Sequence, residues 1–146
     1  MEQIDVLNPT ERKLLIFLYR WNDTLPPNAG DVKQALSLPA STVSSTLRRL
    51  KEKTVEEPLI YWEPRHSIQL TEHGQRTALH LDRHHHVLEF FLHHSLGMKV
   101  DEAHEEAEML GLGTSCRLVQ LIIDKHNIDE WQNYCVCPHH ESCGGK

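Results

Sequence analysis

The chain has 146 residues, of which 39% are hydrophobic and 25% are charged, as in ordinary soluble globular proteins. No apolar stretch is long enough to cross a bilayer, and the first residues lack the basic and apolar regions of a signal peptide. We therefore expect a cytoplasmic protein with no membrane partner.

The net charge of −6 is unevenly distributed along the chain, because residues 1–53 carry 8 Lys/Arg and 6 Asp/Glu whereas residues 84–146 carry 4 Lys/Arg and 10 Asp/Glu. This difference predicts separate roles for the two halves.

The first half predicts three helices in close succession. A helix over residues 11–21 is expected to be capped by Thr10. Its inward face is formed by Leu14, Leu15, Leu18 and Trp21. A second helix runs from Gly30 to about Leu36, and after a short turn a third covers residues 41–51. Two short helices joined by a tight turn are typical of a helix-turn-helix.

The third helix combines an apolar face with a small polar one. Val43, Leu47 and Leu50 are expected to pack inward. The opposite face carries hydroxyl and guanidinium groups that suit base edges and phosphates: Ser41, Thr42, Ser45, Arg48 and Arg49. Each of these residues would also suit a capped, solvated helix, so the order of the elements is the stronger signal.

A β-hairpin is predicted after the third helix. Residues 59–62 and 67–70 read as its strands, and Arg65 lies at the tip, where it could meet a DNA phosphate. Residues 70–74 (LTEHG) then cap the next helix. The series helix, helix, turn, helix, hairpin, helix indicates a winged helix that binds double-stranded DNA.

The second half predicts metal ligands at helical spacing. In a helix over residues 75–94, which is apolar enough for a dimer interface, His85 and Glu89 lie four apart and share a face. His104 and Glu108 have the same spacing in a helix from Asp101 to Leu110. These four side chains could bind one Fe²⁺, Mn²⁺ or Zn²⁺ ion. The alternative is that the glutamates form a solvated acidic face.

Four cysteines form a second candidate site. Cys135, Cys137 and Cys143 lie close together near the end of the chain, and Cys116 lies in a helix that starts near Thr114. Thiolates favour zinc or an iron–sulfur cluster. The spacing matches neither a common zinc finger nor a ferredoxin, and the alternative is a disordered tail with unligated thiols.

Across residues 8–125 the chain resembles the diphtheria-toxin-repressor family of iron- and manganese-dependent regulators. The resemblance is carried by residues 40–44 (ASTVS), 70–74 (LTEHG), 83–92 (RHHHVLEFFL), 96–97 (LG) and 100–108 (VDEAHEEAE). It implies a homodimer that binds a palindromic operator, with ferrous or manganous ion as co-repressor. His85, Glu89 and His104 fall where the family has ancillary-site ligands, and Glu108 falls where it has a regulatory-site ligand.

Three positions depart from that family pattern. Family members follow the last of these ligands with a glutamate and a histidine, where this chain has Gly111 and Leu112. The first-helix ligand of the family is replaced by Lys13, whose ammonium would repel a cation. We therefore expect the usual regulatory site to be lost in this sequence, and we expect no counterpart of the SH3-like domain of longer members.

The sequence thus predicts a mainly α protein. A winged helix-turn-helix domain (1–75) is followed by an all-α dimerisation and metal-binding domain (76–134) and a Cys/His-rich tail (135–146). The leading hypothesis is a metal-responsive repressor and not an enzyme. The alternatives are a winged-helix regulator that senses iron–sulfur, redox or zinc status through its cysteines, a metal-dependent hydrolase or metal-buffering protein, and a winged-helix protein that senses no metal.

Overall fold

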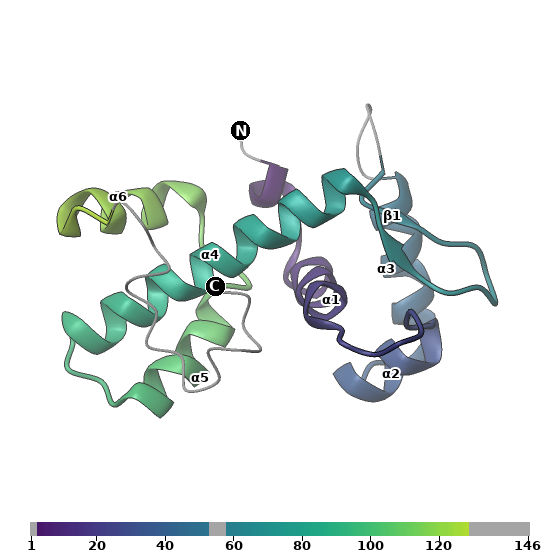
Figure 1. Cartoon of the computed structure of the whole chain (residues 1–146), viewed down its shortest axis with the longest axis horizontal. Coiled ribbons are helices and arrows are strands. Elements are labelled where there is room, and N and C mark those ends of the chain that lie inside the picture. Colours follow the sequence, from purple (N-terminus) through teal and green to yellow (C-terminus); the bar gives the residue numbers. More distant parts are fainter. Residues whose placement is uncertain (1–2, 53–57, 129–146) are drawn as a thin grey trace. The chain divides into compact units, whose positions relative to one another are not determined.

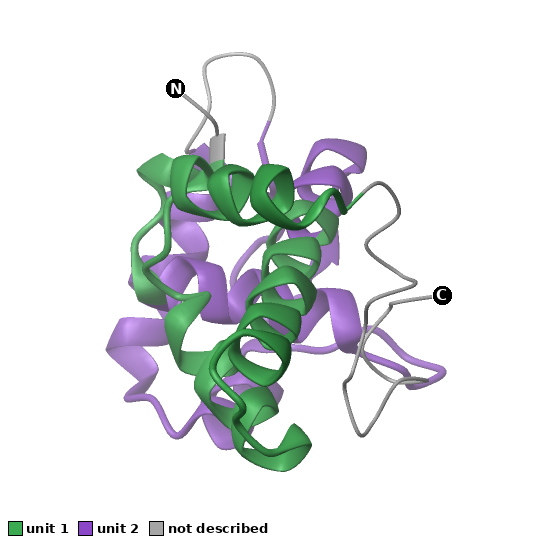
Figure 2. Cartoon of the chain, turned by 90° about the vertical axis from the view of Figure 1, so that its left-hand side faces the viewer, with its two compact units in different colours: residues 1–9, 79–146 green, residues 10–78 purple. Residues whose placement is uncertain are grey.

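The computed structural model describes residues 3–52 and 58–128 and confirms a mainly α fold (Figure 1). The chain divides into two compact units, residues 10–78 (unit 2) and residues 1–9 with 79–146 (unit 1), which Figure 2 colours separately. Across the described ranges, no helix is both long and apolar enough to span a membrane.

Unit 2 begins with helix α1 (Pro9–Arg20, whose first residue belongs to unit 1). The helix starts at Pro9, so the prediction that Thr10 caps it is wrong; proline is favoured at a first helical position, where no N–H partner is needed. Leu14, Leu15 and Leu18 are buried as predicted. Trp21 lies beyond the end of the helix, where its indole N–H donates to the Leu25 carbonyl (2.8 Å).

Helices α2 (Ala29–Leu36) and α3 (Ala40–Glu52) form the helix-turn-helix. A capping box starts α2, since the Asn28 side chain accepts from the Asp31 N–H and the Asp31 carboxylate accepts from the Asn28 N–H. Ser37 ends it in a left-handed conformation (φ 52°). The predicted inward face of α3 is confirmed, because Val43, Leu47 and Leu50 are all buried.

The wing is a short antiparallel pair of strands, β1 (Ile60–Tyr61) and β2 (Gln69–Leu70), with Ile60 opposite Leu70. The two paired strands are shorter than the predicted hairpin, and a contact outside the strand pair fixes the segment that precedes β2. The Ile68 N–H donates to the Pro27 carbonyl (2.8 Å), and Ile68 is buried. At the tip, the His66 N–H donates to the Glu63 carbonyl and closes a four-residue turn.

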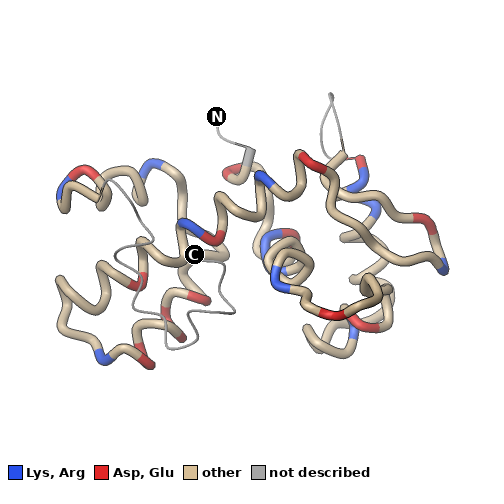
Figure 3. Tube along the Cα trace, in the orientation of Figure 1, with Lys and Arg blue, Asp and Glu red and all other residues tan. Residues whose placement is uncertain are grey.

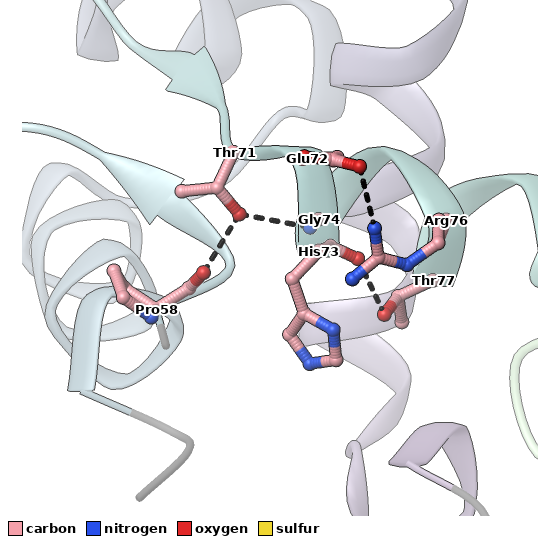
Figure 4. A network of polar contacts seen from close by, with 7 residues as sticks. All are labelled: Pro58, Thr71, Glu72, His73, Gly74, Arg76 and Thr77. Carbon is pink, nitrogen blue, oxygen red and sulfur yellow. Dashed lines mark hydrogen bonds and ion pairs between the residues drawn. The ribbon is translucent and has the colours of Figure 1, made fainter. Parts of the chain in front are cut away.

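The wing leads directly into helix α4 (Glu72–His94) through a network around Thr71 (Figure 4). The Thr71 hydroxyl donates to the Pro58 carbonyl (2.7 Å) and accepts from the Gly74 N–H (2.9 Å), which confirms the predicted cap. Gly74 lies so close to the wing that a Cβ there would stand 1.9 Å from the Leu59 carbonyl oxygen. A glycine is therefore required at this position.

Unit 1 contains most of α4, followed by α5 (Val100–Leu110) and α6 (Cys116–His126). Its core draws on all three helices, and includes Val87, Leu88, Leu92, Ala103, Ala107, Val119 and Ile122. The short 3-10 helix η1 (Gln3–Val6) belongs to the same unit, and its Asp5 carboxylate accepts from the Cys116 N–H (3.0 Å).

Replacing Gly74 by alanine should destabilise the protein. A methyl group at 1.9 Å from a backbone oxygen forces the wing or the start of α4 to move, and we expect a loss of about 2–3 kcal/mol in the free energy of unfolding, within the usual range for overpacking. Urea unfolding followed by circular dichroism measures it. Gly113→Ala is the control, because its Cβ would meet nothing within 4 Å and should leave stability unchanged or slightly raised. Equal stabilities for the two variants would contradict this account.

Candidate metal centre and nucleic-acid interface

The outer face of α3 is the candidate DNA-reading surface. Ser41, Arg48 and Arg49 are exposed, and Thr42 and Ser45 are half-buried, so all five predicted residues lie away from the buried face. The Ser45 hydroxyl donates to the Thr42 carbonyl within the helix (3.1 Å). Hydroxyl groups on such a face can hydrogen-bond phosphates and base edges.

Two cations of α3 are held by partners within unit 2. Arg49 donates to the Thr46 hydroxyl (3.2 Å) and lies 3.9 Å from the fully buried Glu11 carboxylate of α1. Lys51 contacts Glu63 of the wing at 2.6 Å. The hydrogen bond and charge of Lys51 hold the pKa of Glu63 below its ordinary value. Arg49 and Lys51 therefore connect α3 to α1 and to the wing.

Arg65 occupies the wing tip in an uncommon backbone conformation. Its φ of 71° is left-handed, and it follows Pro64 in the turn closed by Glu63 and His66. Proline second and a positive φ third are typical of a type II turn, where glycine is the usual third residue. A long cation in place of glycine at an exposed tip suits contact with phosphate.

The predicted metal ligands of α4 and α5 meet inside unit 1. Glu89 is fully buried, and its Oε1 contacts both His85 Nε2 and His104 Nδ1, the latter at 3.0 Å. One ligand atom from each of the three residues lies within 4.8 Å of the other two. The i,i+4 spacing of His85 and Glu89 provides one side of this cluster, and α5 supplies His104 from the other side.

Glu108 lies at a different nitrogen of the same histidine. Its Oε1 is 3.4 Å from His85 Nδ1, whereas Glu89 contacts His85 Nε2. The structure thus brings three of the four predicted ligands together and places the fourth behind the His85 ring. When a metal takes the place of the proton on Nε2, a carboxylate there can accept the Nδ1–H and hold the ring in the orientation that the metal needs.

The buried carboxylate suits a cation. Burial by itself raises the pKa of Glu89, but hydrogen bonds from His85 and His104 and their charges outweigh it and hold the pKa below its ordinary value. Its second oxygen, Oε2, has no hydrogen-bond partner among the described residues. A buried, ionised carboxylate with one unused oxygen beside two imidazoles is a donor set that fits a divalent metal ion.

The departures from the family pattern have a structural counterpart. Positions 111 and 112 are glycine and leucine, which have no metal-ligating group, and helix α5 ends just before them, at Leu110 with Gly111 as its C-cap. Lys13 is exposed on α1. Along α5, Asp and Glu occur without Lys or Arg, as the trace in Figure 3 illustrates.

Of the four cysteines predicted to form a second site, Cys116 alone lies within the described residues. Cys135, Cys137 and Cys143 lie outside the described residues. Cys116 is the first residue of α6, and its Sγ lies 3.9 Å from His80 Nε2 on α4, with His84 beside them. Sequence reasoning missed both histidines, although their i,i+4 spacing on α4 is the same signal that identified His85 and Glu89.

Comparisons with known proteins find similarity to metal-dependent repressors. Residues 71–142 match the model of the iron-dependent repressor metal-binding and dimerisation domain. The comparison with curated proteins gave no match. A solved manganese-dependent transcriptional repressor in complex with manganese is 29% identical, with a TM-score of 0.66 over 82% of this chain and 54% of that one. The manganese regulator SloR is 27% identical, with a TM-score of 0.61 over 90% and 56%.

This chain therefore spans about half the length of those two regulators. A hypothetical protein from Sulfolobus solfataricus shares the fold over nearly its whole length, with a TM-score of 0.68 over 92% of this chain and 96% of that one, at 20% identity. The helix-turn-helix, the wing and the matched metal-binding domain lead to one conclusion. Over residues 71–142 the chain carries the metal-binding and dimerisation domain of the iron-dependent repressors, which is the domain of the diphtheria-toxin-repressor family, and its fold resembles that of solved manganese-dependent regulators.

Proposed function

We propose that this protein is a homodimeric repressor whose affinity for operator DNA rises when Fe²⁺ or Mn²⁺ binds to His85, Glu89 and His104. The buried Glu89 carboxylate between the two imidazoles is the observation that carries the proposal. Two nitrogens and a carboxylate suit Fe²⁺ and Mn²⁺ alike, and the ion supplies positive charge that holds α4 and α5 together. Glu108 orients the His85 ring through Nδ1.

Helix α4 offers a physical route from metal to DNA. It is capped by Thr71 beside the wing and, further along, carries His85 and Glu89. A metal that favours one arrangement of α4 and α5 can change DNA affinity only if that arrangement is also the DNA-competent one. On this proposal, loss of the family's regulatory site leaves the His85–Glu89–His104 cluster as the metal-responsive element.

Dimerisation is supported by apolar side chains that unit 1 leaves exposed. On α5 these are Met109 and Leu110, and on α6 they are Leu118 and Leu121. Large apolar side chains left exposed on a small domain are typical of a surface that a partner covers. A two-fold dimer would present two copies of α3 to the two halves of a palindromic operator.

The metal proposal predicts that Glu89→Gln loses affinity for Mn²⁺ by more than about 100-fold, because it removes the only anionic ligand of the proposed set. Mutating a residue that only hydrogen-bonds to a ligand lowers metal affinity by roughly 10–100-fold, so the loss of a direct ligand should exceed that range. Anaerobic calorimetric titration with Mn²⁺ and Fe²⁺ measures the affinity. The matched control is Glu106→Gln, an exposed glutamate of the same acidic helix α5, which should bind like the wild type. Unchanged affinity in Glu89→Gln would overturn the assignment.

The same titration separates a ligand from a positioning residue at Glu108. If Glu108 orients His85, Glu108→Gln keeps an acceptor for the Nδ1–H and loses less than about tenfold, whereas Glu108→Ala loses roughly 10–100-fold. Equal and large losses in both variants would make Glu108 a direct ligand.

DNA binding should depend on Arg48, an exposed cation on the outer face of α3. We expect Arg48→Ala to weaken binding by roughly 10- to 100-fold, as for loss of one arginine that contacts a base or phosphate. Fluorescence anisotropy with DNA enriched from a random pool on the wild-type protein measures it at fixed salt. Arg117→Ala, which removes the same charge from the exposed surface of α6, controls for net charge and should have little effect. A larger loss of DNA affinity in Arg117→Ala than in Arg48→Ala would show that the outer face of α3 is not the DNA-binding surface.

A further inference from the structure

A second cluster of ligand-type side chains lies in unit 1, apart from the proposed Fe²⁺/Mn²⁺ site. His80 and His84 are four residues apart on α4, and their rings meet edge to face at a centroid distance of 4.8 Å. Cys116 joins them from the first turn of α6, with its Sγ 3.9 Å from His80 Nε2. One ligand atom from each of the three lies within 4.8 Å of the others.

We propose that His80, His84 and Cys116 form a zinc site. Two imidazoles and a thiolate form a borderline-soft donor set, which binds zinc in preference to the harder Mn²⁺ ion. Tetrahedral zinc, with Zn–N near 2.0 Å and Zn–S near 2.3 Å, would set nitrogen and sulfur about 3.5 Å apart. The observed 3.9 Å lies within a small side-chain adjustment of that value. A water molecule completes the fourth position.

The surroundings of Cys116 favour the thiolate and a cation beside it. The residue begins α6, whose amino end carries partial positive charge that stabilises a thiolate. Its N–H donates to the Asp5 carboxylate of η1, a negative charge that by itself opposes the thiolate but attracts a metal ion, whose own positive charge would offset the repulsion. His84 is only 3% exposed, whereas His80 and Cys116 are half-buried. Zinc can therefore reach the cluster from the side of His80 and Cys116.

The two clusters are distinct because neighbouring helix residues point in different directions. His84 and His85 are adjacent, so their side chains leave α4 about 100° apart. His85 turns to Glu89 and to α5, whereas His84 turns to His80 and Cys116. The zinc site connects α4 to α6, and the Fe²⁺/Mn²⁺ site connects α4 to α5. Zinc would thus stabilise unit 1 without depending on the sensing metal.

The test uses a background in which Cys135, Cys137 and Cys143 are replaced by serine, so that Cys116 is the only thiol. Titration with Co²⁺ should give a thiolate-to-cobalt charge-transfer band and the visible bands of tetrahedral cobalt at one equivalent, and Zn²⁺ should abolish both. Adding Cys116→Ser should remove the charge-transfer band, and His80→Ala should weaken Co²⁺ binding by more than about 100-fold. Circular dichroism checks that each variant folds.

Two further variants make the test specific. His94→Ala, an exposed histidine on the same helix, should leave the band unchanged. Glu89→Gln should also keep it while losing Mn²⁺, so failure of the zinc site and failure of the sensing site can be told apart. No charge-transfer band in the triple-serine background, or a band that His80→Ala and His84→Ala both leave intact, would overturn the proposal.

Discussion

The burial of the Glu89 carboxylate is the constraint on which the metal-binding unit depends. A charged group without solvent must be paired, and Glu89 lies between His85 of its own helix and His104 of α5. Those contacts hold its pKa below the ordinary value against the effect of burial, yet its Oε2 has no hydrogen-bond partner within residues 3–52 and 58–128. Without a cation the arrangement is incompletely satisfied, so metal binding and the packing of α4 on α5 are expected to favour each other.

Much of the fold follows from local sequence signals. The apolar spacing of Val43, Leu47 and Leu50 predicted the buried face of α3, and the Thr71–Gly74 segment predicted the cap of α4. Both are short-range features, set by helix periodicity and by one side chain bonding to a nearby N–H. The start of α1 was misplaced because Thr10 and Pro9 are both acceptable near a helix start, and the proline took the first helical position.

The candidate site was harder to predict from the sequence. Helical spacing shows that two side chains share a face, but it does not show which atom each polar group contacts. His104 and Glu108 are four apart, but Glu108 meets the Nδ1 side of His85 while His104 meets Glu89. The pairing of Cys116 with His80 joins residues 36 positions apart, and its contact with Asp5 joins residues 111 apart. Tertiary packing sets such contacts, and no periodicity in the sequence encodes them.

The most direct test of the central claim is the coupling between metal and DNA. DNA affinity should be measured across a Mn²⁺ titration, and Mn²⁺ affinity with and without DNA, for the wild type and Glu89→Gln. Because linkage is reciprocal, the account predicts that Mn²⁺ raises DNA affinity and that DNA raises Mn²⁺ affinity by the same factor, with both effects lost in Glu89→Gln. DNA affinity that is identical in Mn²⁺ and in chelator would contradict it, and leave a winged-helix protein whose DNA binding is independent of this metal site.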